Sequence, residues 1–124
     1  ILLGFSYESG MTVLHIDDVD RIGIGGVVEK AREVVGDGPT YISFDVDGLD
    51  PAFTPGTGTP EAGGLTPREA QAILHGLKGI DIIGGDVVEV APQYDPTTNT
   101  AMVGAQMLFE IFSLMVLAPK SSHR

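Results

Sequence analysis

Cysteine is absent from the 124 residues, and positive charge is scarce, with 7 lysines and arginines against 17 aspartates and glutamates. The absence of cysteine excludes disulfides, zinc-thiolate sites and thiol nucleophiles. The formal net charge of -10 argues against nucleic acid and against anionic membrane surfaces as partners, because their phosphates would be repelled. The same charge suits metal cations and cationic substrates.

The length of the chain and its first residues set the expected organisation. With 43% hydrophobic residues, the chain is long enough for one compact domain and too short for two. No Arg-rich transit segment and no signal peptide opens it, so a cytoplasmic location is expected, with an organelle as the alternative. The first residue is Ile1 rather than Met, which indicates a processed chain or a part of a longer one.

Apolar runs predict the strands. A short run over residues 1–7 is interpreted as a strand remnant, and residues 11–16 as a strand. A further strand begins at Tyr41, and residues 80–90 are so continuously apolar that they predict a strand buried on both faces.

Three segments predict helices. Residues from about 18 to 36 have helical periodicity, with a first half weakened by glycines, and residues from about 100 to 117 form a very apolar segment interpreted as a packed helix rather than a membrane span. Between them, Thr66, Pro67 and Glu69 form the capping pattern of a helix start. The alternation of strands and helices predicts a parallel sheet covered by helices on both faces.

Three carboxylates fall where such a sheet carries its sites, at the carboxyl ends of the strands. Asp45 and Asp47 end one strand and, in regular strand geometry, would project from one face about 6–7 Å apart. Two carboxylates this close repel each other, and a divalent cation removes that penalty. The alternative is a solvated pair. Glu89 ends the next strand, and a buried salt bridge is its alternative role.

The segment around this pair resembles a known family. SFDVD at residues 43–47, DP at 50–51, TPGTGTP at 54–60 and the two glycines at 63–64 are similar to the signature of the ureohydrolases, the arginase and agmatinase superfamily. GDVVEVAP at residues 85–92 resembles the second carboxyl-terminal motif of that family at the expected distance. The continuation EVAPQYD resembles agmatinases and guanidinobutyrases more than arginases.

The resemblance implies an arginase-like, three-layer α/β/α fold with a parallel sheet and a binuclear manganese site. Asp45 and Asp47 match metal ligands, Glu89 matches the glutamate that binds the guanidinium group, and Thr59 matches a threonine that supports the substrate site. The implied reaction is manganese-dependent hydrolysis of a guanidino compound, with agmatine converted to putrescine and urea. The resemblance also implies a homo-oligomer, a trimer or a hexamer.

Other family motifs have no counterpart here. The family uses a Gly-Gly-Asp-His segment, an Asp-Ala-His-x-Asp segment and a catalytic histidine earlier in the chain, so no catalytic residue is assigned. His15 echoes the second segment but lies too close to Asp45, and it is interpreted as an ordinary strand-end histidine. Residues 1–124 are therefore expected to be the carboxyl-terminal part of a single ureohydrolase domain.

Two other interpretations remain. The missing histidines favour an inactive fragment or a non-catalytic subunit that retains the fold. The segment from Asp45 to Gly48 also resembles the nucleophile motif of haloacid-dehalogenase-like phosphatases, although Leu49 occupies the position where that motif has Thr or Ser.

Overall fold

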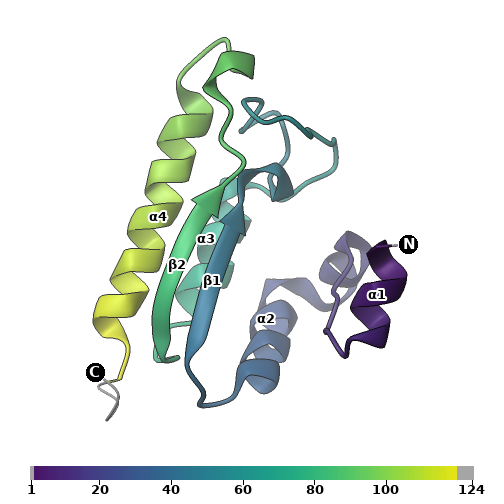
Figure 1. Cartoon of the computed structure of the whole chain (residues 1–124), viewed down its shortest axis with the longest axis vertical. Coiled ribbons are helices and arrows are strands. Elements are labelled where there is room, and N and C mark those ends of the chain that lie inside the picture. The colour runs from purple at the N-terminus through teal and green to yellow at the C-terminus, as the bar shows by residue number, and fades with distance from the viewer. Residues whose placement is uncertain (1, 120–124) are drawn as a thin grey trace.

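The computed structural model describes residues 2–119, which contain four helices and a small parallel sheet (Figure 1). The elements in chain order are α1 (Leu2–Glu8), α2 (Ile16–Val35), β1 (Thr40–Asp45), the 3₁₀ helix η1 (Val46–Gly48), α3 (Pro67–Gly76), β2 (Ile82–Val88), the 3₁₀ helix η2 (Pro92–Tyr94) and α4 (Asn99–Leu117).

The sheet consists of β1 and β2, which run parallel with α3 as the connection between them. Ser43 pairs with Asp86 and Asp45 pairs with Val88, so both strands terminate at the same end of the sheet (Figure 1). The prediction of an α/β fold with a parallel sheet is confirmed.

The core lies between one face of the sheet and the helices α3 and α4. Leu74 from α3, Ile82 from β2, and Met107, Ile111 and Leu114 from α4 are buried there. Gly85 allows α4 to approach β2 closely, because a Cβ atom at this position would lie 2.5 Å from Cγ2 of Ile111. The opposite face of the sheet, which carries Tyr41, Ser43 and Asp86, is not packed against a helix layer among residues 2–119.

The helix start at α3 is confirmed. The Thr66 hydroxyl accepts a hydrogen bond from the Glu69 N–H at 3.1 Å, and the Glu69 carboxylate accepts one from the Thr66 N–H at 2.9 Å, with Pro67 in the first turn. Gly79 follows the helix with φ of 94°, a left-handed conformation that glycine adopts without strain. Local sequence chemistry therefore determines where this helix begins and where the chain turns toward β2.

The predicted helices at both ends of the chain are also present. The amphipathic segment forms α2, in which Gly23 has φ of 72° and interrupts the helix, so the weakening of its first half is confirmed. The apolar segment forms α4, which is long and apolar enough to cross a membrane but packs one side against β2 and α3. The end of the chain at residues 120–124, interpreted as frayed, lies outside the described residues.

Two strand predictions are wrong. Of residues 1–7, the described part belongs to helix α1, and residues 11–15 form no strand before α2 begins at Ile16. An apolar run becomes a strand only when a neighbouring strand takes up its backbone hydrogen bonds, and the described sheet contains no strand beyond β1 and β2. His15 is consequently not a strand residue; it precedes α2, where its ring nitrogen pairs with the Tyr7 hydroxyl at 2.6 Å.

The prediction that residues 80–90 are buried on both faces is also wrong for this chain. The strand is shorter, Ile82–Val88, and its exposed positions include Ile83, whose surface is 52% accessible. A continuous apolar run predicts a strand with cover on both faces. Here only the face toward α4 is covered among the described residues.

Candidate functional site

The carboxylates singled out in the sequence meet at the carboxyl end of the sheet. Asp45 is the last residue of β1, Asp47 lies in η1 directly after it, and Glu89 follows the last residue of β2. The long loop between η1 and α3 lies at the same end of the sheet (Figure 1). Two strand ends and one loop therefore provide the frame of the site.

Asp45 and Asp47 lie together through a tight turn rather than through strand alternation. The strand ends at Asp45, and the Asp47 N–H donates a hydrogen bond of 3.0 Å to Oδ1 of Asp45. The assumption that both residues belong to one regular strand is wrong, because the 3₁₀ turn begins at Val46. The predicted proximity of the two carboxylates is nevertheless confirmed.

The electrostatics of this pair favour a cation. Partial desolvation is the largest cause that raises the pKa of Asp45, even though the residue as a whole is exposed. The Asp47 carboxyl raises the pKa further by hydrogen bonding and charge, and the charge of Glu89 raises it as well, whereas the Asp47 N–H opposes these effects. Negative charge is therefore concentrated at the strand ends, and a bound cation would relieve the repulsion.

Thr59 lies against this pair. Its hydroxyl donates a hydrogen bond of 2.6 Å to Oδ2 of Asp47. The side chain therefore fixes the orientation of the Asp47 carboxylate, and its assignment to substrate binding stays a prediction.

Glu89 has an unusual backbone conformation. Its φ is 69°, and no other residue except glycine has a positive φ among residues 2–119. The left-handed region costs a residue with a Cβ about 1–2 kcal/mol, and strain of this kind clusters at functional sites. The sequence gives no signal for this conformation, which occurs directly after β2 at an exposed residue.

The loop that carries Thr59 is fastened at several points that the sequence analysis missed. The buried Thr54 hydroxyl donates to the carbonyl of Val46 at 3.0 Å, and the buried Thr100 hydroxyl accepts from the Gly56 N–H at 2.9 Å. The Gly56 carbonyl in turn accepts from the Ala91 N–H at 2.7 Å. The loop is thus tied both to η1 and to the segment that follows Glu89, so the two halves of the site are held in one frame.

Asp95, in the turn between η2 and α4, completes this anchorage. Oδ2 of Asp95 accepts from the Thr100 N–H at 2.9 Å, and Oδ1 accepts from the N–H and the hydroxyl of Thr97, both at 2.8 Å. Hydrogen bonding to Thr100 first, and then to Thr97, lowers the pKa of Asp95 to about 2. Gly56 packs directly on this turn, since a Cβ there would lie 2.8 Å from Cβ of Asp95.

The carboxylate pair fits one side of a divalent cation site but does not complete it. Asp45 and Asp47 offer oxygen ligands of the kind that manganese accepts. No group of three or more histidine, cysteine, aspartate or glutamate side chains able to hold a metal occurs within residues 2–119. His15 and His75 are engaged elsewhere, with Tyr7 and Glu110 respectively.

Two further features, a cleft and an unpartnered hydroxyl, lie close to Asp47 and Thr59 in space or in sequence. A cleft of about 240 Å³ lies beside Asp47 and is lined also by Glu61, Gly63 and Gly64. The hydroxyl of Thr57, two residues before Thr59, is buried without a hydrogen-bond partner among the described residues. A larger cavity exists, but it lies between α4 and β2, away from the carboxylates.

Comparison with known proteins points to one family. The arginase family profile matches residues 4–113. Guanidinopropionase from Pseudomonas aeruginosa is 52% identical over 111 residues, which cover 90% of this chain and 35% of that protein. Mitochondrial agmatinase from Gallus gallus is 47% identical, with coverages of 90% and 33%. The structure of proclavaminate amidino hydrolase from Streptomyces clavuligerus has a TM-score of 0.88 at 38% identity and covers 91% of this chain and 38% of its own.

The chain belongs to the arginase family, the ureohydrolases. The family resemblance stated from the sequence is confirmed, and with it the arginase-like α/β fold. Membership in this family leaves no support for the phosphatase interpretation. The chain spans about a third of the length of the relatives it matches, so it corresponds to a part of their domain.

Proposed function

We propose that the protein containing this chain hydrolyses a guanidino compound and releases urea and an amine. The observation that carries the proposal is the cluster of Asp45, Asp47 and Glu89 at one end of the parallel sheet, in a chain of the arginase family. The chain contributes this carboxylate side of the site, and the remaining metal ligands and the catalytic histidine belong to the part of a ureohydrolase that it does not cover.

The residues divide into roles by their chemistry. Asp45 and Asp47 would hold two manganese ions together with ligands from the remaining part, and Thr59 would keep the Asp47 carboxylate in position. Bound manganese would supply Lewis-acid chemistry: it lowers the pKa of a metal-bound water, so that hydroxide is available at neutral pH. Glu89 would orient the planar guanidinium group by accepting two of its N–H donors. The positive φ of Glu89 supports this role, because backbone strain of this kind clusters at functional sites, and the charge of Glu89 acts on Asp45.

Agmatine is the proposed substrate, with putrescine and urea as products. The net charge of -10 and the concentration of carboxylates at the site favour a substrate that is cationic at both ends. Guanidinopropionate and guanidinobutyrate, suggested by the names of two relatives, carry an anionic end and are the competing substrates. The proposed compartment is the cytoplasm, and the proposed assembly is a trimer or a hexamer.

A second candidate follows from the incomplete ligand set. Because the described residues offer only the carboxylate pair, the chain by itself would act as a non-catalytic subunit or an inactive fragment. This candidate and the first differ in one respect, which is whether the missing ligands are supplied.

Manganese binding and urea release test both candidates. For the 124-residue chain alone, we expect weak manganese binding by calorimetry and no urea from agmatine. In the protein with the remaining ligands, we expect Asp45→Ala to abolish urea release and to lower manganese affinity at least about tenfold. Even the mutation of residues that only support metal ligands lowers metal affinity by this factor. The fold, monitored by circular dichroism, should persist because Asp45 is exposed.

Asp37→Ala is the matched control, because Asp37 is an exposed aspartate before the other end of β1. We expect this variant to keep both manganese binding and urea release. Undiminished urea release by Asp45→Ala would refute the assignment of the carboxylate pair.

A further inference from the structure

The side chain of Asp86 joins the two strands of the sheet. Its Oδ1 accepts a hydrogen bond of 2.7 Å from the Ser43 hydroxyl, and its Oδ2 accepts one of 2.7 Å from the Tyr41 hydroxyl. Both donors belong to β1 and the acceptor belongs to β2, so one carboxylate bridges the strands at two points. Hydrogen bonds to an ionised acceptor are stronger than neutral ones. The group of Tyr41, Ser43 and Asp86 is named here the Asp86 tie.

The electrostatics of these side chains agree with the hydrogen bonds. Hydrogen bonds from Ser43 and then from Tyr41 hold the pKa of the Asp86 carboxyl below its usual value. The hydrogen bond to Asp86 is in turn the largest cause that raises the pKa of the Tyr41 hydroxyl. The carboxylate is therefore favoured as the acceptor and the phenol as the donor.

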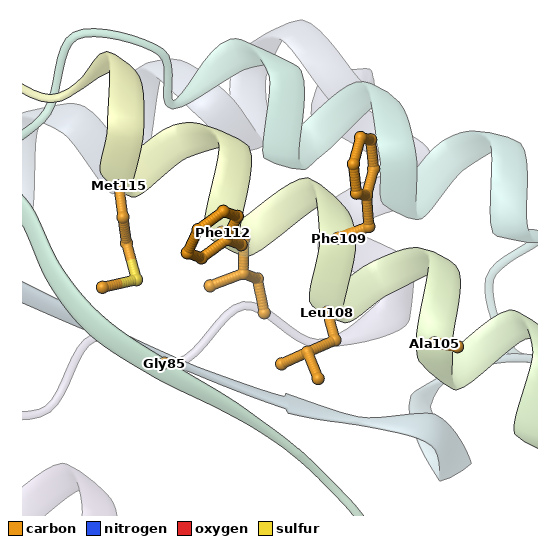
Figure 2. A pocket seen from close by; sticks show the side chains of 7 residues that line it. Gly85, Ala105, Leu108, Phe109, Phe112 and Met115 are labelled. Carbon is orange, nitrogen blue, oxygen red and sulfur yellow. The ribbon is translucent and has the colours of Figure 1, made fainter.

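The two glycines of β2 serve opposite faces of the sheet. Gly85 lies toward α4, and Figure 2 shows the apolar side chains of that helix on this side of the strand, Leu108, Phe112 and Met115. Gly84 lies toward the ring of Tyr41, because a Cβ at this position would be 3.0 Å from Cδ2 and Cε2 of the ring. The absence of a side chain at position 84 therefore leaves room for the ring that reaches across from β1 to β2.

The Asp86 tie follows an irregularity in the strand pairing. Thr40 pairs with Ile82 but Tyr41 pairs with Gly84, so β2 contains one extra residue at this point. A pair of strands alone is only marginally stable, and parallel pairing is the weaker kind. A slip of the pairing by one residue would also carry every side chain of a strand to the other face. The two hydrogen bonds of Asp86 oppose such a slip directly after the irregularity.

The register of the strands determines how the two halves of the candidate site lie relative to each other. Asp45 ends β1 and pairs with Val88, and Glu89 is the next residue along the chain. The pair of Ser43 and Asp86 precedes this pair on the same face of the sheet. A slip by one residue would move Glu89 by about 3.3 Å relative to Asp45.

We propose that Asp86 is a positioning residue that locks the register of β1 and β2. The lock fixes the distance between Glu89 and the metal-binding pair of Asp45 and Asp47, and Asp86 touches neither metal nor substrate in this role. A displacement of about 1 Å between reacting groups can lower a rate about a hundredfold, so the lock acts on the reaction itself. The effect on the reaction rests on the proposed function, whereas the lock between the strands does not.

The kinetics of urea release test this role in the manganese-loaded protein with the remaining ligands, with agmatine, guanidinopropionate and guanidinobutyrate as substrates. We expect Asp86→Ala to lower kcat/KM about 10- to 100-fold in folded protein. The loss of manganese affinity, measured by calorimetry, should stay below the roughly tenfold that a residue supporting a metal ligand would cause. Asp86→Asn should give an intermediate kcat/KM, because the amide oxygen retains one acceptor.

Single bonds of the tie can be removed separately. Tyr41→Phe and Ser43→Ala should each lower kcat/KM less than Asp86→Ala does, and neither should lower it further when combined with Asp86→Ala, because the tie is then already broken. Tyr7→Phe is the matched control, since it removes a tyrosine hydroxyl that pairs with His15 outside the sheet. We expect this control to leave kcat/KM unchanged.

Hydrogen exchange in the 124-residue chain tests the lock without reference to activity. In Asp86→Ala and in Tyr41→Phe, we expect the amides of residues 84–88 to exchange at least about threefold faster, because the lost hydrogen bonds no longer oppose local opening of the strands. Exchange in α4 should stay slow. Tyr41→Phe keeps the test decisive if Asp86→Ala does not fold, and unchanged exchange in the strands of the folded variants would overturn the lock.

The outcomes separate the lock from the proposed function. Folded Asp86→Ala with the kcat/KM of the original would overturn the role of Asp86 in the reaction. A loss of manganese affinity as large as the loss of kcat/KM would also overturn it, because Asp86 would then act on the metal ligands. An original protein that releases no urea from any of the three substrates counts against the proposed function, and hydrogen exchange then decides on the lock alone.

Discussion

The amino-terminal third of the chain and the rest of it are built differently. The helix α2 contains no buried residue, and α1 exposes Leu3, Phe5 and Tyr7. From β1 to α4, in contrast, a continuous core of buried side chains joins the sheet to two helices. The first region has secondary structure without a core of its own, and the second has both.

The two regions are joined through the contact of α2 with α3. The helix α2 packs against α3, where Val28 lies against Gly76. The Arg32 guanidinium donates to the carbonyls of Gly76 and Lys78 at 2.9 and 3.1 Å. The region from β1 to α4 therefore contains the buried core of the described chain, whereas the second half of α2 is held against α3 and against the margin of that core, where Val35 packs.

The largest effect is expected from a cavity in the core. Ile82→Ala truncates a side chain that is 0% accessible, and we expect the free energy of unfolding, measured in urea, to fall by about 2–5 kcal/mol. Val34→Ala in α2 is the contrasting variant, because Val34 is 53% accessible, and its effect should stay within about 0.5 kcal/mol. Comparable losses for the two variants would remove the distinction between the regions.

A smaller effect is expected at the junction itself. In Gly76→Ala the new Cβ would lie 2.5 Å from Cγ2 of Val28, so α2 must move away from α3, at a cost of about 1–3 kcal/mol. Hydrogen exchange should accelerate in α2 and remain slow in β2 and α4.

Gly25→Ala provides the control for the junction, because nothing lies within 4 Å of the added Cβ and the residue belongs to α2. There alanine should stabilise the helix by about 0.5–1 kcal/mol, since glycine loses more conformational entropy on folding. Faster exchange in α4 with Gly76→Ala would show that the regions unfold as one unit.

The same division separates what could be predicted from the sequence and what could not. The start of α3 was predictable, because Thr66 and Glu69 satisfy each other's backbone N–H groups within one turn. The strand predictions at residues 1–7 and 11–16 failed, because an apolar run cannot specify whether a neighbouring strand will be present. Interactions that close within a few residues can be inferred from sequence, and interactions that need a distant partner cannot.

The site follows this rule as well. The family resemblance singled out Asp45, Asp47, Thr59 and Glu89 as candidates, and the local turn at Asp47 brings the first two together. The left-handed conformation of Glu89 and the buried anchors Thr54 and Thr100 were missed. Their partners lie 8 and 44 residues away in the chain, too far for any local pattern to indicate.

The smallest effect is expected at the loop anchor, because Asp95 is only partly buried and water screens its interactions. Its pKa is lowered from 3.8 to about 2 by hydrogen bonds from Thr100 and Thr97 that exist only in the folded chain. A group with a lowered pKa stabilises the fold above its unfolded value, and this stabilisation is lost as the pH falls toward the folded value. Stability should therefore decline between about pH 4 and pH 2.

Asp95→Asn isolates this contribution, because the amide retains the shape of the carboxylate but does not titrate. Urea unfolding at a series of pH values should give a shallower decline below pH 4 for this variant than for the original chain. The same substitution at Asp37, an exposed aspartate in the turn before β1, should leave the decline as it is. An identical pH dependence for Asp95→Asn and the original chain would mean that the hydrogen bonds of Asp95 persist in the unfolded chain, and that the loop carrying Thr59 is fastened to α4 mainly through Thr100 and Gly56.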